Sequence, residues 1–183
     1  KTDTTKWPVI RESLLYNTGW ELKDTIGNFG KFMIKKPVKG KGIVFQYVKR
    51  YDQSRASHGE YNEVVTWHIP EEKDRFEIKL DSFSQINYLF STHILGADKN
   101  AKSISGTIKG VRQNENWFVT GSLIVTLSNY RGAPQKIDFS STFTKAGYSG
   151  NDPEKILRAE TEPFYSENKK EYLPSDLIKR TSN

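Results

Sequence analysis

The feature that most constrains this chain is a succession of short, closely spaced segments in which apolar and polar residues alternate. The segments are rich in β-branched and aromatic residues and are bounded by Gly, Pro, Asn, Asp or Ser, which is typical of strands and turns. The clearest alternation begins at Trp117 and Val119, with Thr120 and Ser122 on the opposite side. Because parallel strands need crossovers of a dozen or more residues, and no helix-length crossover separates these segments, the pattern predicts a mostly antiparallel sheet.

Nine strands are expected from this pattern. In chain order they cover residues 20–26, 29–36, 42–51, 61–69, 75–82, 86–95, 103–111, 117–129 and 136–144. A basic turn is expected around Pro37–Gly40, and Gly121 suggests a bulge or bend in the longest strand.

Two helices are expected outside the strands. The first covers residues 8–16: Pro8 suits an initial helical turn, Ile10 and Leu14 share a face, and a Gly-containing stop follows. The second runs from an N-cap at Asp152 to about Glu162. We therefore expect an antiparallel β domain with a short N-terminal helix, and a C-terminal helix and tail packed on or extending from it.

The domain bounds that follow are 1–150 for the β domain and 151–183 for the C-terminal helix and tail. A meander that closes into a barrel protects its strand edges, and a sandwich is the alternative. The order of a short helix, eight or nine strands and a final helix resembles the architecture of lipocalin-like barrels. That family typically carries Gly-x-Trp on its first strand, whereas Gly19 and Trp20 are adjacent here.

The aromatic residues, 13% of the chain, suggest where a ligand would bind. If the aromatic faces of the strands point inward, they line an apolar cavity with a few polar tips, the usual character of a small-molecule site. The expected ligand-binding residues are Trp20, Phe45, Tyr47, Trp67, Tyr88, Phe90 and Trp117. The same residues could instead fill the core with their own side chains.

Catalytic signals are weak, and we expect the chain not to be an enzyme. It has no nucleophile elbow, P-loop or dinucleotide fingerprint, and its three histidines are not at metal-ligand spacing, so no catalytic residue, metal or cofactor is assigned. An isomerase or cyclase remains an alternative. It would need His68, His93 or Glu63 to face an enclosed cavity beside a second polar group.

The remaining expectations concern partners and location. The sequence predicts binding of an apolar or amphipathic small molecule, or alternatively a protein partner that docks on a sheet edge or on the C-terminal tail. The net charge of +6 is spread along the chain, so nucleic acid is not expected as a partner. No run of residues is long and apolar enough for a transmembrane segment. The lack of cysteine leaves the compartment open, but the missing initiator Met suggests an extracytoplasmic protein: periplasmic, secreted or lipid-anchored through a removed N-terminus.

Overall fold

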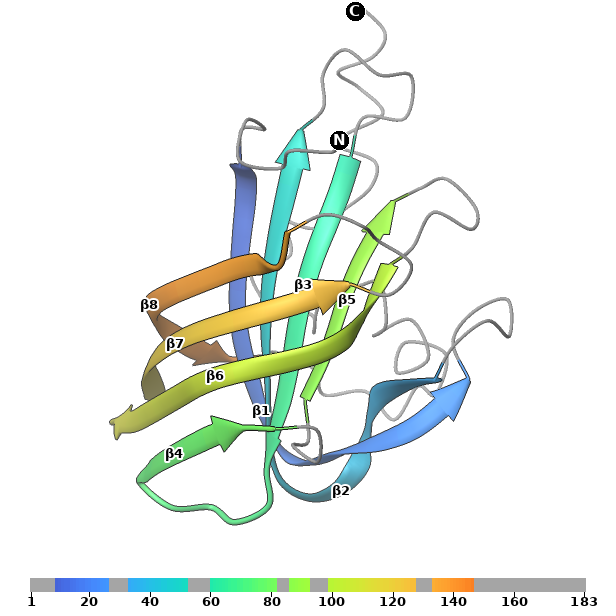
Figure 1. Cartoon of the computed structure of the whole chain (residues 1–183). Helices are drawn as coiled ribbons and strands as arrows, with labels where there is room; N and C mark the ends of the chain where they lie inside the picture. The colour runs from blue at the N-terminus through green and yellow to red at the C-terminus, as the bar shows by residue number, and fades with distance from the viewer. Residues whose placement is uncertain are drawn as a thin grey trace, which may run out of the picture.

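The computed structural model describes residues 9–26, 33–52, 60–81, 86–92, 99–127 and 133–146, which include eight β-strands (Figure 1). The strands are β1 (Val9–Ile26), β2 (Met33–Asp52), β3 (Glu60–Ile69), β4 (Arg75–Leu80), β5 (Ile86–Thr92), β6 (Lys99–Gln113), β7 (Asn116–Leu127) and β8 (Gln135–Lys145). The mainly antiparallel β class is confirmed. The expected C-terminal helix and tail lie outside the described residues.

The helix expected over residues 8–16 is wrong where the structure describes it, because β1 begins at Val9. Side chains here alternate between the two faces of a strand: Tyr16 faces one side of the sheet and Leu15 the other, and both are buried. The helical spacing of Ile10 and Leu14 carries less weight than pairing with β2, which extends along the whole of β1. Tertiary pairing therefore overrides a weak helix pattern.

The turn expected around Pro37–Gly40 is also wrong, because these residues continue β2. β1 and β2 form one long hairpin that bends where the register shifts between Thr18 and Trp20. Gly19 and Gly42 have φ of 73° and 97° at this bend, a conformation that other residues rarely adopt. We call the part beyond the bend, residues 20–26 and 33–39, the arm.

The strand order in the sheet is β4-β6-β5-β3-β2-β1-β8-β7, with an additional pairing between β6 and β7. Neighbours are antiparallel except β1 and β8, which run parallel. The sheet is not closed into a barrel, contrary to the expectation: β5 pairs with β6, and β1 with β8, over two residue pairs each. β4 also leaves the meander order, because it pairs with β6 while β5 pairs with β3.

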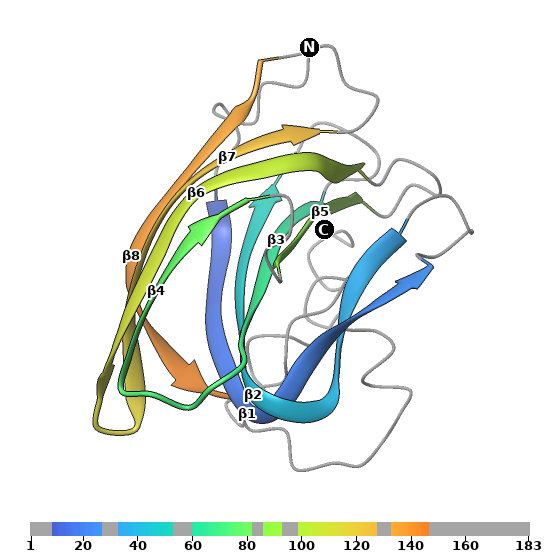
Figure 2. The same ribbon diagram turned by 60° about the horizontal axis from the view of Figure 1, so that its bottom comes forward.

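The sheet folds on itself so that two parts face each other across one core. The first layer consists of β1, β2, β3 and β5, and the second of β4, β6, β7 and β8 (Figure 2). Figure 1 shows the strands of the second layer crossing those of the first. Both layers contribute buried side chains to the core between them, including Phe45 and Trp67 from the first and Trp117 and Phe143 from the second.

Candidate functional site

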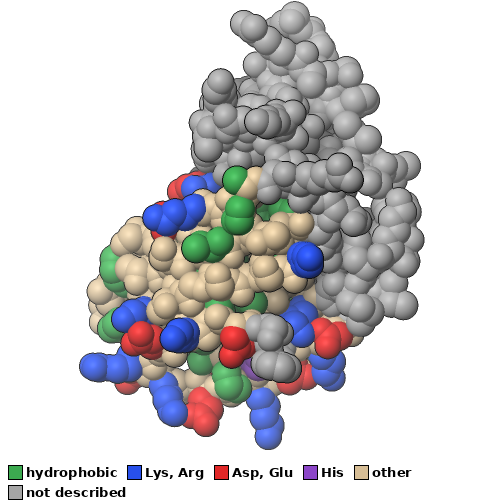
Figure 3. Space-filling view, in the orientation of Figure 1, with side chains coloured by type: hydrophobic (Ala, Val, Ile, Leu, Met, Phe, Trp, Pro, Cys, Tyr) green, Lys and Arg blue, Asp and Glu red, His purple; other side chains and the backbone are tan. Residues whose placement is uncertain are grey.

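A groove of about 530 Å³ opens where β3 ends and β4 begins. Its lining residues come from the end of β3, the connection and β4: His68, Ile69, Pro70, Glu71, Lys73, Arg75, Phe76, Glu77 and Ile78. Figure 3 shows charged side chains of both signs gathered around this lower part of the molecule. The volume falls in the range of about 300–1,000 Å³ that is usual for small-molecule sites.

The local sequence explains why the groove has an apolar floor and a charged rim. β4 alternates strictly, so Phe76 and Ile78 turn inward while Arg75 and Glu77 are exposed. Pro70, which lacks an amide hydrogen, follows the end of β3. The rim and the floor therefore come from one short strand and the turn before it.

Ion pairs hold the rim in place. Lys73 Nζ lies 2.5 Å from Glu71 Oε2, and Lys109 Nζ lies 2.9 Å from Glu77 Oε1. The hydrogen bond from Lys73, together with its charge, lowers the pKa of the Glu71 carboxyl below its ordinary value. All four side chains are more than half exposed, so these pairs orient charges without adding much stability.

The floor of the groove continues into the aromatic core. The Phe76 ring lies 5.3 Å from that of Phe45 and 5.5 Å from that of Trp117. Phe45 in turn stacks on Trp67, with ring centroids 5.2 Å apart. Three residues expected to bind a ligand thus lie beneath Phe76, and each is at most 1% exposed.

His68 lies at the edge of the groove and is half-buried. Its Nε2 is 2.8 Å from the carbonyl oxygen of Lys41, so this nitrogen carries the hydrogen and donates it. A Cβ at Gly42 would lie 2.1 Å from the carbonyl oxygen of Ile69 and 2.8 Å from His68 Nε2. The hydrogen bond to Lys41 and the close packing at Gly42 therefore hold the His68 ring in place.

Two more expected ligand residues, Tyr47 and Tyr88, lie further along the strands, away from the groove. Val65 pairs with both of them across the first layer, which places the two tyrosines in one row. In the next row Glu63 pairs with Phe90, the sixth of the expected residues. These aromatic side chains are at most 3% exposed.

Glu63 is 4% exposed and belongs to a polar network at this end of the core. The Tyr88 hydroxyl is 2.8 Å from Glu63 Oε2 and 2.8 Å from Gln135 Oε1, and the Tyr47 hydroxyl donates to Glu12 Oε1 at 3.3 Å. A phenol carries one hydrogen, so Tyr88 donates to Glu63 when the Gln135 amide is turned to present its nitrogen. This network brings Glu63 beside a second polar group, and acid–base chemistry there remains a prediction.

The alternation of side chains along β3 could have indicated the position of Glu63, which falls on the same face of the strand as Val65 and Trp67. The sequence reasoning considered Glu63 but missed Glu12 and Gln135. These two residues belong to β1 and β8, far away in the chain, and no spacing within either strand predicts that they meet the tyrosines.

Trp20 does not join the other six expected ligand residues. It packs with Leu15, Leu22, Val44 and Ala146 on the face of the first layer that points away from the core. The Lys39 ammonium lies 4.6 Å from the centre of its ring. The bend at Gly19 changes the register of β1 and is the reason for this placement.

Of the other histidines, His58 and His93 lie outside the described residues. Among the residues that the structure describes, no three His, Asp or Glu side chains are grouped so as to hold a metal ion. The same residues contain no helix with the length and apolar character needed to cross a membrane. Comparison of the chain with protein-family models, curated proteins and solved structures found no match.

Proposed function

We propose that this protein is a non-enzymatic binding module that takes an apolar or amphipathic small molecule in the groove between the end of β3 and β4. The observation that supports this best is a floor of Ile69, Phe76 and Ile78 beneath a rim of charged side chains. A concave apolar surface with a few polar groups at its edge is the usual character of such a site.

The floor supplies affinity because its side chains keep apolar surface in contact with solvent. Phe76 and Ile78 are half-buried, so a ligand removes further apolar area from water, at about 25 cal/mol per Å². Phe76 rests on Phe45 and Trp117, so the floor is formed before a ligand arrives. A preformed surface loses little conformational entropy on binding.

The rim supplies orientation. Glu71, Lys73, Arg75 and Glu77 place both signs of charge around the floor, and His68 adds an imidazole ring at its edge. An amphipathic molecule can set its apolar part on the floor and its polar group against this rim. Because the rim is exposed, salt screens its contribution, while the apolar contribution persists.

A dye titration compares two matched substitutions in the full chain. Ile78→Thr changes the floor, whereas Ile124→Thr makes the same change on the exposed side of β7, where Ile124 is 50% exposed. With Nile red, an uncharged apolar dye, we expect Ile78→Thr to weaken binding about five- to tenfold, as a loss of about 1–1.4 kcal/mol implies. We expect Ile124→Thr to leave the affinity at the wild-type value.

Equal affinities in the two variants would contradict the groove as the binding site. Native mass spectrometry of the purified wild-type chain complements the titration, because a co-purified ligand that Ile78→Thr releases would identify the natural molecule. Denaturation of both variants checks that any loss of binding does not come from unfolding.

A second function, recognition of an extended peptide, is favoured by the position of β4. β4 pairs along one edge with β6, and no described strand pairs with its other edge. A peptide strand added there would place alternate side chains over the groove, as in β-augmentation. Peptides selected on the chain from a random library would bind more weakly after N-methylation of alternate amides, whereas binding unaffected by N-methylation excludes strand addition.

A further inference from the structure

The first layer is buried on both faces. Six consecutive residues of β2, Ile43–Val48, are each at most 2% exposed. Ile43, Phe45 and Tyr47 face the core, so Val44, Gln46 and Val48 point the opposite way. We call the side to which they point the outer face of the first layer.

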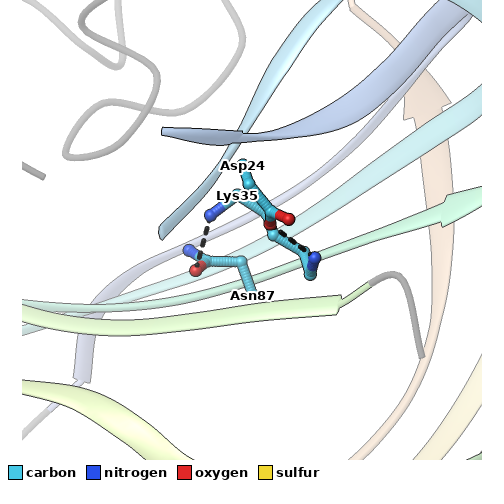
Figure 4. A network of polar contacts seen from close by, with 3 residues as sticks. All are labelled: Asp24, Lys35 and Asn87. Atoms are coloured by element: carbon cyan, nitrogen blue, oxygen red, sulfur yellow. Dashed lines mark hydrogen bonds and ion pairs between the residues drawn. The ribbon is translucent and has the colours of Figure 1, made fainter. Parts of the chain in front are cut away.

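Part of this outer face is covered by the arm. Trp20 and Leu22 of the arm pack with Val44. Further along the arm, the Lys35 amide donates to Asn87 Oδ1 of β5 at 3.3 Å, while the Lys35 ammonium pairs with Asp24 at 2.6 Å (Figure 4). The arm therefore turns back over the layer from which it came.

The rest of the outer face carries an apolar row that the arm does not join. Val48, Val64 and Leu89 are paired across β2, β3 and β5, form a cluster of their own, and are 1%, 1% and 2% exposed. Neighbours within a sheet shield the sides of a residue but not its end, as the 50% exposure of Ile124 on β7 illustrates. In the described part of the chain, no other buried apolar residue belongs to this cluster, so described apolar side chains do not account for its cover.

The chain leaves the described residues beside this face. Ala146 follows β8 and packs with Leu15 and Val44, and its amide donates to the carbonyl oxygen of Tyr16 at 2.8 Å. Phe143, three residues earlier, is still in the core between the layers. The end of β8 thus carries the chain from the core to the outer face.

The segment that follows Ala146, residues 147–183, is rich in charged residues of both signs but contains four adjacent pairs of large apolar residues. The pairs are Ile156-Leu157, Phe164-Tyr165, Tyr172-Leu173 and Leu177-Ile178. A segment of this composition buries too little apolar surface to fold alone, but it can order on an apolar surface that another part of the chain provides.

We propose that residues 147–183 dock on the outer face of the first layer and cover the row of Val48, Val64 and Leu89. The distances allow this: Val48 lies about 13 Å along β2 from Val44, and β5 lies about 10 Å across the sheet from β2. Even wholly helical, the segment spans on the order of 50 Å at about 1.5 Å per residue. The protein then has a third layer, held beside the arm.

Thiol accessibility in the full, otherwise cysteine-free chain tests this docking. Val64→Cys places a small thiol under the proposed cover, and Ile124→Cys is the exposed control. We expect a soluble maleimide to react about 100-fold more slowly with the Val64→Cys variant, because reaction needs local opening. Adding Phe164→Ser, Leu173→Ser and Leu177→Ser should then speed that reaction about tenfold and leave the Ile124→Cys rate unchanged.

Three outcomes would overturn the proposal. Fast labelling of Val64→Cys in the parent chain would show that the row is uncovered, and slow labelling that the three serine substitutions do not change would assign the cover to another segment. Protection that falls on dilution would assign it to a second copy. Leu89→Cys, on the neighbouring strand, repeats the measurement if Val64→Cys disturbs folding.

Discussion

Along β7 every second side chain is buried and its neighbours face outward, whereas along the middle of β2 six consecutive side chains are buried. The two strands lie in layers that share one core, so the difference arises on their outer sides. β7 presents Phe118 and Ile124 to solvent, at 37% and 50% exposure. The second layer is therefore an outer wall of the molecule, while the middle of the first layer is packed on both sides.

The largest expected effect comes from placing the same charge on the outer side of each layer. Val64→Asp puts a carboxylate where Val64 is 1% exposed, and we expect a loss of about 4 kcal/mol or more in the free energy of unfolding. Ile124→Asp should cost less than about 1 kcal/mol, because its site is half exposed. Denaturant unfolding followed by tryptophan fluorescence measures both.

Val64→Thr serves as a graded version if Val64→Asp does not fold, since it replaces one methyl group by a hydroxyl at nearly constant volume. Similar losses for Val64→Asp and Ile124→Asp would mean that the outer face of the first layer is accessible to water, and that the two layers do not differ in this respect.

A smaller effect is expected inside the second layer, where Gly121 of β7 lies against the Phe139 ring. A Cβ at Gly121 would lie 2.3 Å from this ring, so Gly121→Ala must displace it and should cost about 1–3 kcal/mol. Ser122→Ala, the adjacent outward position, should change stability by no more than about 0.5–1.5 kcal/mol through its lost hydrogen bond to Asp138. Thermal unfolding compares the two, and equal costs would contradict the inward packing of Phe139.

This glycine also shows what alternation could and could not predict. The sequence suggested a bulge or bend at Gly121, but the pairing of β7 with β6 and β8 passes through it without a register shift, so the described strand has no bulge there. The inward positions of β7 were predicted correctly, because a strand that is exposed on one side shows its register in its residue types. The close approach of Phe139 was not predictable, because it belongs to another strand.

The first layer was harder to predict for a related reason. Its strands carry apolar residues on both faces, so residues 9–18 lack clean alternation and helical spacing competed with it. The bend at Gly19 and Gly42 was not predicted, because the sequence shows two separate glycines but does not show that they lie in neighbouring strands. A basic turn was therefore expected inside what is one continuous hairpin.

The aromatic residues beneath the candidate site could be predicted from the sequence, but the position of the groove could not. Phe45, Trp67 and Trp117 were expected to share an interior, and they do. The groove above them depends on β4 pairing with β6 instead of with a strand next to it in the sequence. The residues of β4 themselves do not indicate which strand it pairs with. Residues of the charged turn before β4 also line the groove.

The smallest expected effect concerns the charges on the exposed side of the second layer. Asp138 accepts a hydrogen bond from Ser122 at 2.7 Å and pairs with Lys136 at 3.1 Å, and both contacts lower the pKa of its carboxyl below the ordinary 3.8. A lowered pKa in the folded state means that Asp138 contributes stability above pH 3.8, and that this contribution is lost as the pH falls through the folded-state pKa. Asp138→Asn should therefore be slightly less stable than wild type near neutral pH, and the difference should vanish in acid. Denaturant unfolding of both chains from neutral to acid pH measures the difference. A constant gap would show that the carboxylate charge does not matter, and that the outer side of the second layer depends on the neutral hydrogen bond alone.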